Sequence, residues 1–349
     1  MTQMAMNLHK IADKKVLEDV GFFFNKVNER ALYKLGHVSF YDDGGDPALA
    51  KDIEYFHPQI TLDDRMKYIM ENIVLSDIEP EERICNTIIS HFYGARGIHQ
   101  LLTRDPNPKT ALVEFGRLLN DVEYEGQIRD NINKATELGL PTYGSTELRT
   151  SLFGAANSYV AELKQAPRNS DRINILLWVA SFIKTGVTEK MLKATSLSDL
   201  YDTLTKLPGV GQYYGYHCST SNSVNPAIAV NHDERFCVPG PGARKTLDKI
   251  FGASCKVPYG EQVIWFRENY RDYIGDIFLH PSTHNVIVDG TQIFAEAQDD
   301  LKVYGCEVGL CQYSVYDRLR ANPHLAKRRK VARVSKEQEA QFFRSTCTS

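Results

Sequence analysis

The chain has 349 residues, of which 42% are hydrophobic and 24% charged, a composition typical of a globular protein with one large or two medium domains. The formal net charge of −3 excludes a generally basic nucleic-acid-binding protein, so any DNA binding must rest on local patches. The best apolar stretch, Ile173–Ile183, is too short for a membrane span, and the polar N-terminus lacks the apolar core of a secretion signal. We therefore expect no membrane partner.

The cysteines argue against a metal centre and for a reducing compartment. None of the seven cysteines forms a CxxC pair, so the sequence contains no recognisable zinc or iron–sulfur motif. An odd number of cysteines without a signal peptide is typical of reduced thiols in the cytoplasm. We expect a cytoplasmic protein with no metal site.

Helical periodicity dominates the chain, and strand patterns are scarce. A helix is expected to start near Thr61, Asp63 and Asp64 and to continue through Tyr68–Val74. The same apolar spacing predicts helices through residues 84–92, 112–119, 176–183, 197–207 and 264–277. Val286–Val288 is a weak strand candidate. Loops are expected at residues 42–47, 105–108, 139–144, 219–226 and 280–285.

These elements predict a mostly α protein with two helical lobes. We place an N-terminal helical lobe at residues 1–150 and a second lobe, which carries the chemistry, at residues 151–334. A polar tail follows at residues 335–349. The C-terminal helices are expected to pack back on the first lobe.

The most informative short motif is Leu207–Gly211, at the end of a predicted helix. Pro208 ends that helix, Gly209 and Gly211 permit a tight turn, and Val210 fills the gap between two helices. The next helix then starts with exposed backbone amides, which form a natural phosphate site that grips DNA without reading its sequence. By itself the pattern is equally consistent with an ordinary corner between two helices.

A cluster of acidic residues follows the hairpin in the sequence. The segment of residues 225–233 resembles the region of helix-hairpin-helix DNA glycosylases in which a catalytic aspartate follows the hairpin, here Asp233 beside His232 and Glu234. Glycosylases of this kind with lyase activity carry a lysine two residues after the second hairpin glycine. Tyr213 occupies that position, so we do not expect a Schiff-base lyase.

A rigid loop with two prolines and two glycines, at residues 238–242, directly precedes another predicted helix. Cations are unfavourable at a helix N-terminus, so Arg244 and Lys245 in the first turn make sense if an anion binds there. The alternative is a capped loop with two solvated charges. The candidate anion-binding residues are Gly240, Gly242, Ala243, Arg244 and Lys245.

Three blocks of this sequence resemble the alpha-glutamyl/putrescinyl thymine pyrophosphorylase family, the phage amino acid:DNA transferases related to helix-hairpin-helix glycosylases. They are Leu207–Gly211, Phe236–Ala243 and the region from Cys306 to Lys330, with weaker echoes at Asn28–Arg30 and Leu62–Arg65. The blocks occur in the family's order and span most of the chain. The resemblance implies a mostly α, two-lobed, glycosylase-like fold. It also implies that the protein is found in the host cytoplasm if a phage encodes it.

Four positions depart from the family pattern. Gln312 stands where the family has glutamate, Ser314 where it has aspartate, and Val315 where it has lysine. Arg235 precedes the phenylalanine-led loop where an acid is usual. These differences affect the identity of the catalytic acid more than the identity of the family.

The resemblance implies that the protein replaces the pyrophosphate of 5-pyrophosphoryloxymethyluracil in DNA with an amine. The loop described above would hold the leaving pyrophosphate. An acid must deprotonate the amine, and the candidates in order of preference are Asp233, Glu234, His232 and Glu307. The partners would be double-stranded DNA with a modified thymine and a small amine or amino acid. No cofactor is required, although Mg²⁺ can accompany pyrophosphate.

DNA binding is expected from the hairpin and from a basic run near the C-terminus. The candidate DNA-binding residues are Gly209, Val210, Gly211, Tyr213, Lys327, Arg328, Arg329 and Lys330. Tyr213, Tyr214 and Tyr216 can also stack on a flipped base, with plain core packing slightly favoured. His91 is expected to be a satisfied core histidine, and Cys311 a structural cysteine.

Two other functions remain open at the level of sequence. The first is a monofunctional helix-hairpin-helix glycosylase that uses Asp233 to excise a modified base. The second is a non-catalytic DNA-binding protein, which the cluster of His232, Asp233 and Glu234 beside a rigid loop makes the least attractive.

Overall fold

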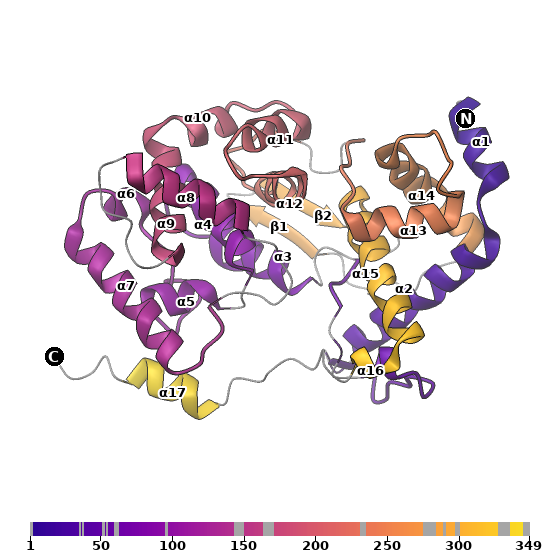
Figure 1. Ribbon diagram of the computed structural model, residues 1–349, viewed down its shortest axis with the longest axis horizontal. Helices are drawn as coiled ribbons and strands as arrows, with labels where there is room; N and C mark the ends of the chain where they lie inside the picture. The colour runs from indigo at the N-terminus through magenta and orange to yellow at the C-terminus, as the bar shows by residue number, and fades with distance from the viewer. Residues whose placement is uncertain are drawn as a thin grey trace. The chain divides into compact units, whose positions relative to one another are not determined.

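The protein is mostly α-helical, as the sequence predicts, and the described residues include a two-stranded antiparallel hairpin (Figure 1). The computed structural model describes residues 3–34, 36, 38–50, 53, 55–58, 63–94, 97–142, 150–162, 171–230, 235–274, 284–288, 291–296, 301–326 and 336–344.

The chain divides into two compact units that alternate along the sequence. Unit 1 comprises residues 1–67 and 233–332, and unit 2 comprises residues 68–232 and 333–349. This division differs from the consecutive lobes expected from the sequence, with their boundary near residue 150. The difference arises because residues 233–332 group with residues 1–67, whereas residues 68–150 group with the helices that follow them in sequence.

Unit 1 contains helices from both ends of the chain. Its N-terminal part has α1 (Gln3–Ile11), α2 (Lys14–Lys34), the short η1 (Pro47–Leu49) and α3 (Asp64–Tyr68), whose last residue begins unit 2. Its C-terminal part has α13 (Pro241–Phe251), α14 (Tyr259–Ile274), β1 (His284–Val288), β2 (Thr291–Glu296), α15 (Val303–Ala321) and α16 (Pro323–Ala326).

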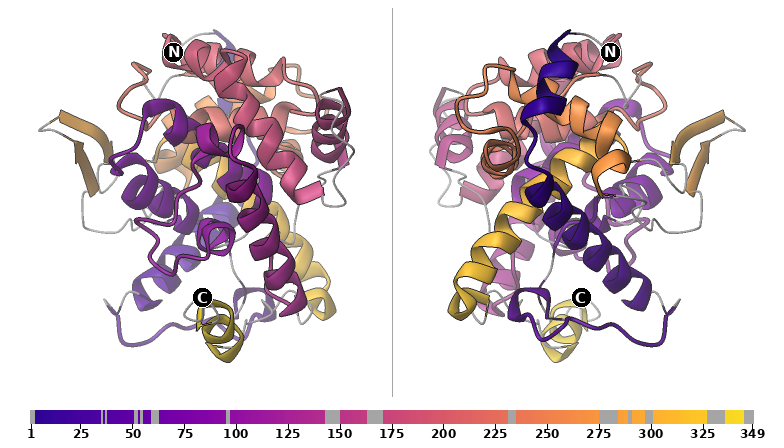
Figure 2. Two further views of the ribbon diagram at one scale, coloured as in Figure 1. Left: turned by 90° about the vertical axis from the view of Figure 1, so that its left-hand side faces the viewer. Right: turned by 90° about the vertical axis from the view of Figure 1, so that its right-hand side faces the viewer.

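The centre of unit 1 is α15, which packs against both α13 and α2 (Figures 1 and 2). Gly309 allows the close approach to α2, because a Cβ at this position would collide with the ring of Phe24. Two turns further along α15, the ring of Tyr316 stacks on that of Phe23 with the centroids 5.0 Å apart. The C-terminal helix α15 therefore packs on the N-terminal part of the chain, as expected.

The β-hairpin lies between α14 and α15 in sequence. His284 pairs with Glu296 and Val288 with Thr291, and the register shifts between Val286 and Ile287. The weak strand signal at Val286–Val288 is therefore confirmed. Most of the loop expected at residues 280–285 lies outside the described residues.

Unit 2 is built from helices throughout its described length. They are the π-helix η3 (Ile69–Val74), α4 (Pro80–Tyr93), α5 (Ile98–Thr103), α6 (Phe115–Leu118), α7 (Val122–Glu137), α8 (Thr150–Glu162), α9 (Asp171–Lys184), α10 (Val187–Leu192), α11 (Leu197–Thr205), α12 (Gln212–Asn222) and α17 (Lys336–Arg344).

The buried helix α4 lies at the core of unit 2 and follows simple capping rules. Pro80 opens it, and Gly94, with φ of +63°, closes it and donates its N–H to the carbonyl of Ser90. His91 is 2% exposed, and its Nε2 lies 2.7 Å from the Ser221 Oγ, so the expected satisfied core histidine is confirmed.

Two sequence-based boundaries were wrong. The helix predicted at residues 112–119 is shorter in the structure, where α6 begins at Phe115, because residues 111–114 are not helical and Val113 bonds to the side chain of Asn86. The loop expected at residues 219–226 begins only after Asn222, because residues 219–222 form the end of α12. The polar side chains of this helix end bond back to carbonyls four residues earlier, as Ser219 does to Gly215 and Thr220 to Tyr216.

Candidate functional site

The corner between α13 and α15 in unit 1 brings the proline-glycine loop against Glu307. Gly240 is the N-cap residue of α13, and its N–H donates to the Glu307 Oε1 over 2.9 Å. Glu307 lies on the buried side of α15 and is 1% exposed. A carboxylate therefore lies at the helix end where the sequence predicted an anion site.

The burial of Glu307 changes its acid–base behaviour. Desolvation raises the pKa of its carboxyl to about 7, while the hydrogen bond from Gly240 acts in the opposite direction. Near neutral pH the group is divided between its acid and base forms. Such a carboxyl can accept a proton during a reaction and release it afterwards.

Arg244 and Lys245 occupy the first turn of α13 with different surroundings. The Arg244 Nε donates to the Pro239 carbonyl over 2.9 Å, and its guanidinium lies 5.6 Å from the ring centroid of Tyr259. The Tyr259 hydroxyl donates in turn to the Asp248 Oδ1 over 2.8 Å. These contacts fix the Arg244 side chain along the loop, whereas Lys245 is exposed.

Part of the expected anion-binding site is occupied by contacts within the protein. Gly242 lies against α15, where an added Cβ would come within 2.5 Å of the Cys311 Sγ, and Ala243 is fully buried. The helix geometry leaves the amides of Gly242 and Ala243 without intrahelical acceptors. Gly240, by contrast, already donates to Glu307. Cys311 is half-buried rather than buried, and its sulfur faces Gly242.

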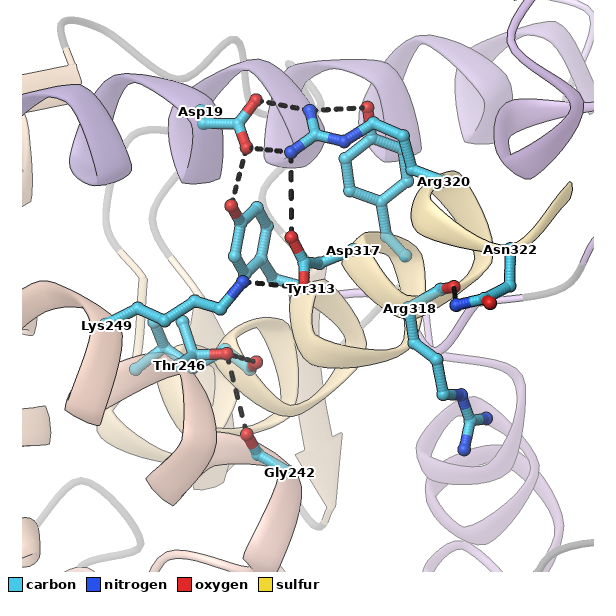
Figure 3. A network of polar contacts seen from close by, with 11 residues as sticks. Asp19, Gly242, Thr246, Lys249, Tyr313, Asp317, Arg318, Arg320 and Asn322 are labelled. Carbon is cyan, nitrogen blue, oxygen red and sulfur yellow. Dashed lines mark hydrogen bonds and ion pairs between the residues drawn. The ribbon is translucent and has the colours of Figure 1, made fainter. Parts of the chain in front are cut away.

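A polar network holds α2, α13 and α15 together next to this corner (Figure 3). Asp19 of α2 accepts a two-pronged contact from Arg320, at 2.6 and 2.7 Å, and a hydrogen bond of 2.5 Å from the Tyr313 hydroxyl. Burial raises the pKa of Asp19, but the bonds from Arg320 and Tyr313 outweigh it and leave the pKa below its ordinary value. Lys249 of α13 joins the network through Asp317 at 2.7 Å.

The turn between α11 and α12 in unit 2 has the geometry that the hairpin motif predicts. Gly209 adopts a φ of +77°, and a Cβ there would collide with the Ser151 carbonyl. Val210 is 5% exposed and fills the corner, while Gly211 is the exposed N-cap of α12. At Gly215, the missing Cβ lets Thr205 of α11 approach closely.

The tyrosines after this turn separate into two groups. Tyr214 is 6% and Tyr216 is 1% exposed, so both belong to the core, as the favoured interpretation held. Tyr213 is half-buried, and its ring centroid lies 4.4 Å from that of His217. Of the three, only Tyr213 is partly exposed.

Several candidate residues lie outside the described part of the chain. These are the acidic cluster and the basic run, namely His232, Asp233, Glu234, Lys327, Arg328, Arg329 and Lys330. Among the candidate acids, the structure therefore describes only Glu307. It also adds the pair Tyr259 and Asp248 beside Arg244, which no local pattern in the sequence indicates.

The described residues also bear on membrane and metal partners. None of the described helices combines the length and the hydropathy that a membrane span requires. Within the same described ranges, no group of three or more His, Cys, Asp and Glu side chains is arranged to hold a metal ion.

Comparison with known proteins gives one match. The sequence model of the family described as "5-hmdU DNA kinase, helical domain" matches residues 60–326, well over half of the chain, and covers most of both units. No curated protein and no solved structure matches the chain.

Proposed function

The chain belongs to the 5-hmdU DNA kinase helical domain family, and from this membership we propose that it takes part in the hypermodification of thymine in phage DNA. The nucleoside in the family's description, 5-hydroxymethyl-2′-deoxyuridine, carries a hydroxymethyl group on the uracil ring. The substrate is accordingly DNA that contains this base or a derivative of it, with the reaction at the exocyclic carbon or its oxygen.

The reaction we favour is the replacement of a pyrophosphate on that exocyclic carbon by an amine. A carbon–oxygen bond to the pyrophosphate breaks, a carbon–nitrogen bond forms, and the amine loses a proton. The observation that carries this proposal is the buried Glu307 carboxyl against Gly240, at the start of the helix whose first turn holds Arg244 and Lys245. Glu307 would take the proton, and the two cations would stabilise the departing anion.

A second reaction is favoured by the description of the family itself. In phosphoryl transfer, the hydroxymethyl oxygen would attack the γ-phosphorus of a nucleoside triphosphate, the bond from that phosphorus to the departing nucleoside diphosphate would break, and Glu307 would accept the hydroxyl proton. The printed sequence contains no G-x-x-x-x-G-K-[ST] pattern, which holds the phosphates in P-loop enzymes. This reaction would therefore use a nucleotide site of another kind.

The turn at Gly209–Gly211 is the proposed contact with the DNA backbone. The amides at the start of α12 lie at an exposed helix end, which suits a phosphate group. Tyr213 and the basic residues Lys327–Lys330 would add contacts to the same DNA.

Nucleoside mass spectrometry distinguishes the reactions. One reaction mixture contains DNA with 5-pyrophosphoryloxymethyluracil and glycine, serine, glutamate or putrescine. The other contains DNA with 5-hydroxymethyluracil and ATP or GTP. A nucleoside heavier by one amine, with pyrophosphate released, supports amine transfer, and a phosphorylated hydroxymethyl group supports phosphoryl transfer.

Two other results would overturn group transfer. Free base with abasic sites would identify a glycosylase, and unchanged nucleosides in both mixtures would leave a DNA-binding protein. The variant Glu307→Gln keeps the shape of the side chain and removes the base. It should lower the rate of either transfer about 10²–10⁴-fold if Glu307 accepts the proton.

A further inference from the structure

The start of α14 packs against the start of α13 in unit 1 (Figure 1). Gly260 permits this close approach, because a Cβ at its position would collide with the carbonyl oxygen of Cys237, three residues before Gly240. Tyr259, the first residue of α14, is therefore fixed beside the first turn of α13, where Arg244 lies. The function proposed above assigns no role to this tyrosine.

Tyr259 contacts two residues of α13 that carry opposite charges. Its hydroxyl donates to the Asp248 Oδ1 over 2.8 Å, and the guanidinium of Arg244 lies 5.6 Å from its ring centroid. At this distance the electron-rich face of the ring attracts the cation. The hydrogen bond to Asp248 raises the pKa of Tyr259, so the hydroxyl keeps its proton at neutral pH and remains a donor. One side chain therefore holds the arginine with its ring and the carboxylate with its hydroxyl.

Arg244 and Asp248 have a spacing at which opposite charges can pair directly. They are four residues apart on one helix, so their side chains lie on the same face. Arg117 and Asp121, which have the same order and spacing, form an ion pair with the Nε and Oδ2 atoms 2.7 Å apart. The side chains of Arg244 and Asp248 are both described, and they do not form such a pair. The Asp248 carboxylate is instead bonded to Tyr259.

The position of the guanidinium matters for the binding of an anion. An ion pair with Asp248 would draw it along α13, away from the helix start, and would offset its charge. The hydrogen bond from the Arg244 Nε to the Pro239 carbonyl and the contact with Tyr259 keep it at the helix start. There Lys245 and the N-terminal amides of α13 also favour negative charge. A guanidinium fixed in advance binds phosphate oxygens through its fork of N–H donors at a lower cost in entropy.

We propose that Tyr259 is a positioning residue, which holds Asp248 away from Arg244 and thereby keeps the arginine at the start of α13 for a phosphate-containing anion. The inference rests on the proposed function in taking pyrophosphate as that anion. Without the Tyr259 hydroxyl, Asp248 would lose its partner and would pair with Arg244. The carboxylate would then compete with the anion for the same guanidinium.

Calorimetric titration of the full chain with inorganic pyrophosphate, in the absence of DNA, tests this role. Tyr259→Phe keeps the ring and removes the hydroxyl, and it should weaken pyrophosphate binding about two- to fivefold, the effect of one competing ion pair. Asp248→Asn should bind pyrophosphate at least as tightly as the wild type, because the competing charge is gone. The double variant should bind as tightly as Asp248→Asn, so the second substitution should rescue the first.

The rescue separates positioning from a purely structural role. If Tyr259 only packed against α13, the loss of its hydroxyl would not be repaired by Asp248→Asn. Asp272→Asn is the matched control, because it removes the same charge from an exposed position about 20 Å further along α14. It should not rescue Tyr259→Phe. A crystal structure of Tyr259→Phe should also show the Asp248 carboxylate within about 4 Å of the Arg244 guanidinium.

Any of three results would overturn the proposal. They are pyrophosphate binding that Tyr259→Phe leaves unchanged, a double variant that binds as weakly as Tyr259→Phe, and no binding of pyrophosphate at millimolar concentration. Because the titration contains neither DNA nor amine, its outcome is separate from that of the transfer assay. Rescue by Asp248→Asn without transfer would reject the proposed function alone, and transfer without rescue would reject the role of Tyr259 alone.

Discussion

At the scale of single residues, Glu307 links the chemistry of the site to the stability of the protein. Its pKa is about 7 in the folded state and 4.5 for an ordinary glutamate, so the folded state holds its proton more tightly. Protonation of Glu307 therefore stabilises the folded state. This contribution to the free energy of unfolding is fully present below about pH 4.5 and is lost as the pH rises through 7. The loss is on the order of 3 kcal/mol. Glu307→Gln should therefore melt at a higher temperature than the wild type near pH 8.

The comparison needs melting temperatures at several pH values between about 5 and 8. The glutamine oxygen of the variant can still accept the Gly240 N–H, so only the titration is removed. Glu18→Gln, at an exposed position of α2, is the matched control, and its melting temperature should change with pH as that of the wild type does. If the melting temperature of Glu307→Gln also changed with pH as that of the wild type does, the result would contradict the desolvation of the Glu307 carboxyl that the structure indicates.

At the scale of elements, the turn between α11 and α12 depends on one of its two glycines more than on the other. Gly209 combines a φ of +77° with direct contact to the Ser151 carbonyl, whereas Gly211 has a φ of −78° and open space around it. Gly209→Ala should lower the free energy of unfolding by about 2–4 kcal/mol and weaken DNA binding. Gly211→Ala should change stability by less than about 1 kcal/mol. Urea unfolding would measure the free energy of unfolding of both variants. Equal losses would contradict the greater dependence of the turn on Gly209.

Elements with a repeating apolar face could be predicted from the sequence, and the individual residue contacts between distant elements could not. The helices α4 and α9 follow from their isoleucine and leucine spacing. The end of α12 was missed because its serines and threonines satisfy themselves within the helix, which composition does not reveal. The contact between Gly240 and Glu307 joins residues 67 positions apart. The sequence marked both residues as candidates, but only the folded α13–α15 corner brings them together.

At the scale of the whole molecule, the distribution of charge decides how the protein can hold DNA. A net charge of −3 gives no general attraction to phosphate, so DNA affinity must come from clusters such as Lys327–Lys330. Each phosphate neutralised by a cation contributes about 0.9 to the slope of the logarithm of affinity against the logarithm of salt concentration. Replacement of these four residues by glutamine should therefore reduce the slope by up to about 3.6.

The hairpin should behave differently in the same titration. Its amides are neutral, so their contact with a phosphate releases few counterions, and Gly209→Ala should weaken binding by a similar factor at every salt concentration. Fluorescence anisotropy with one duplex at several salt concentrations would separate the two effects. A slope that the glutamine variant leaves unchanged would show that Lys327–Lys330 make no contact with DNA. The affinity of this acidic protein would then depend on cations elsewhere in the chain.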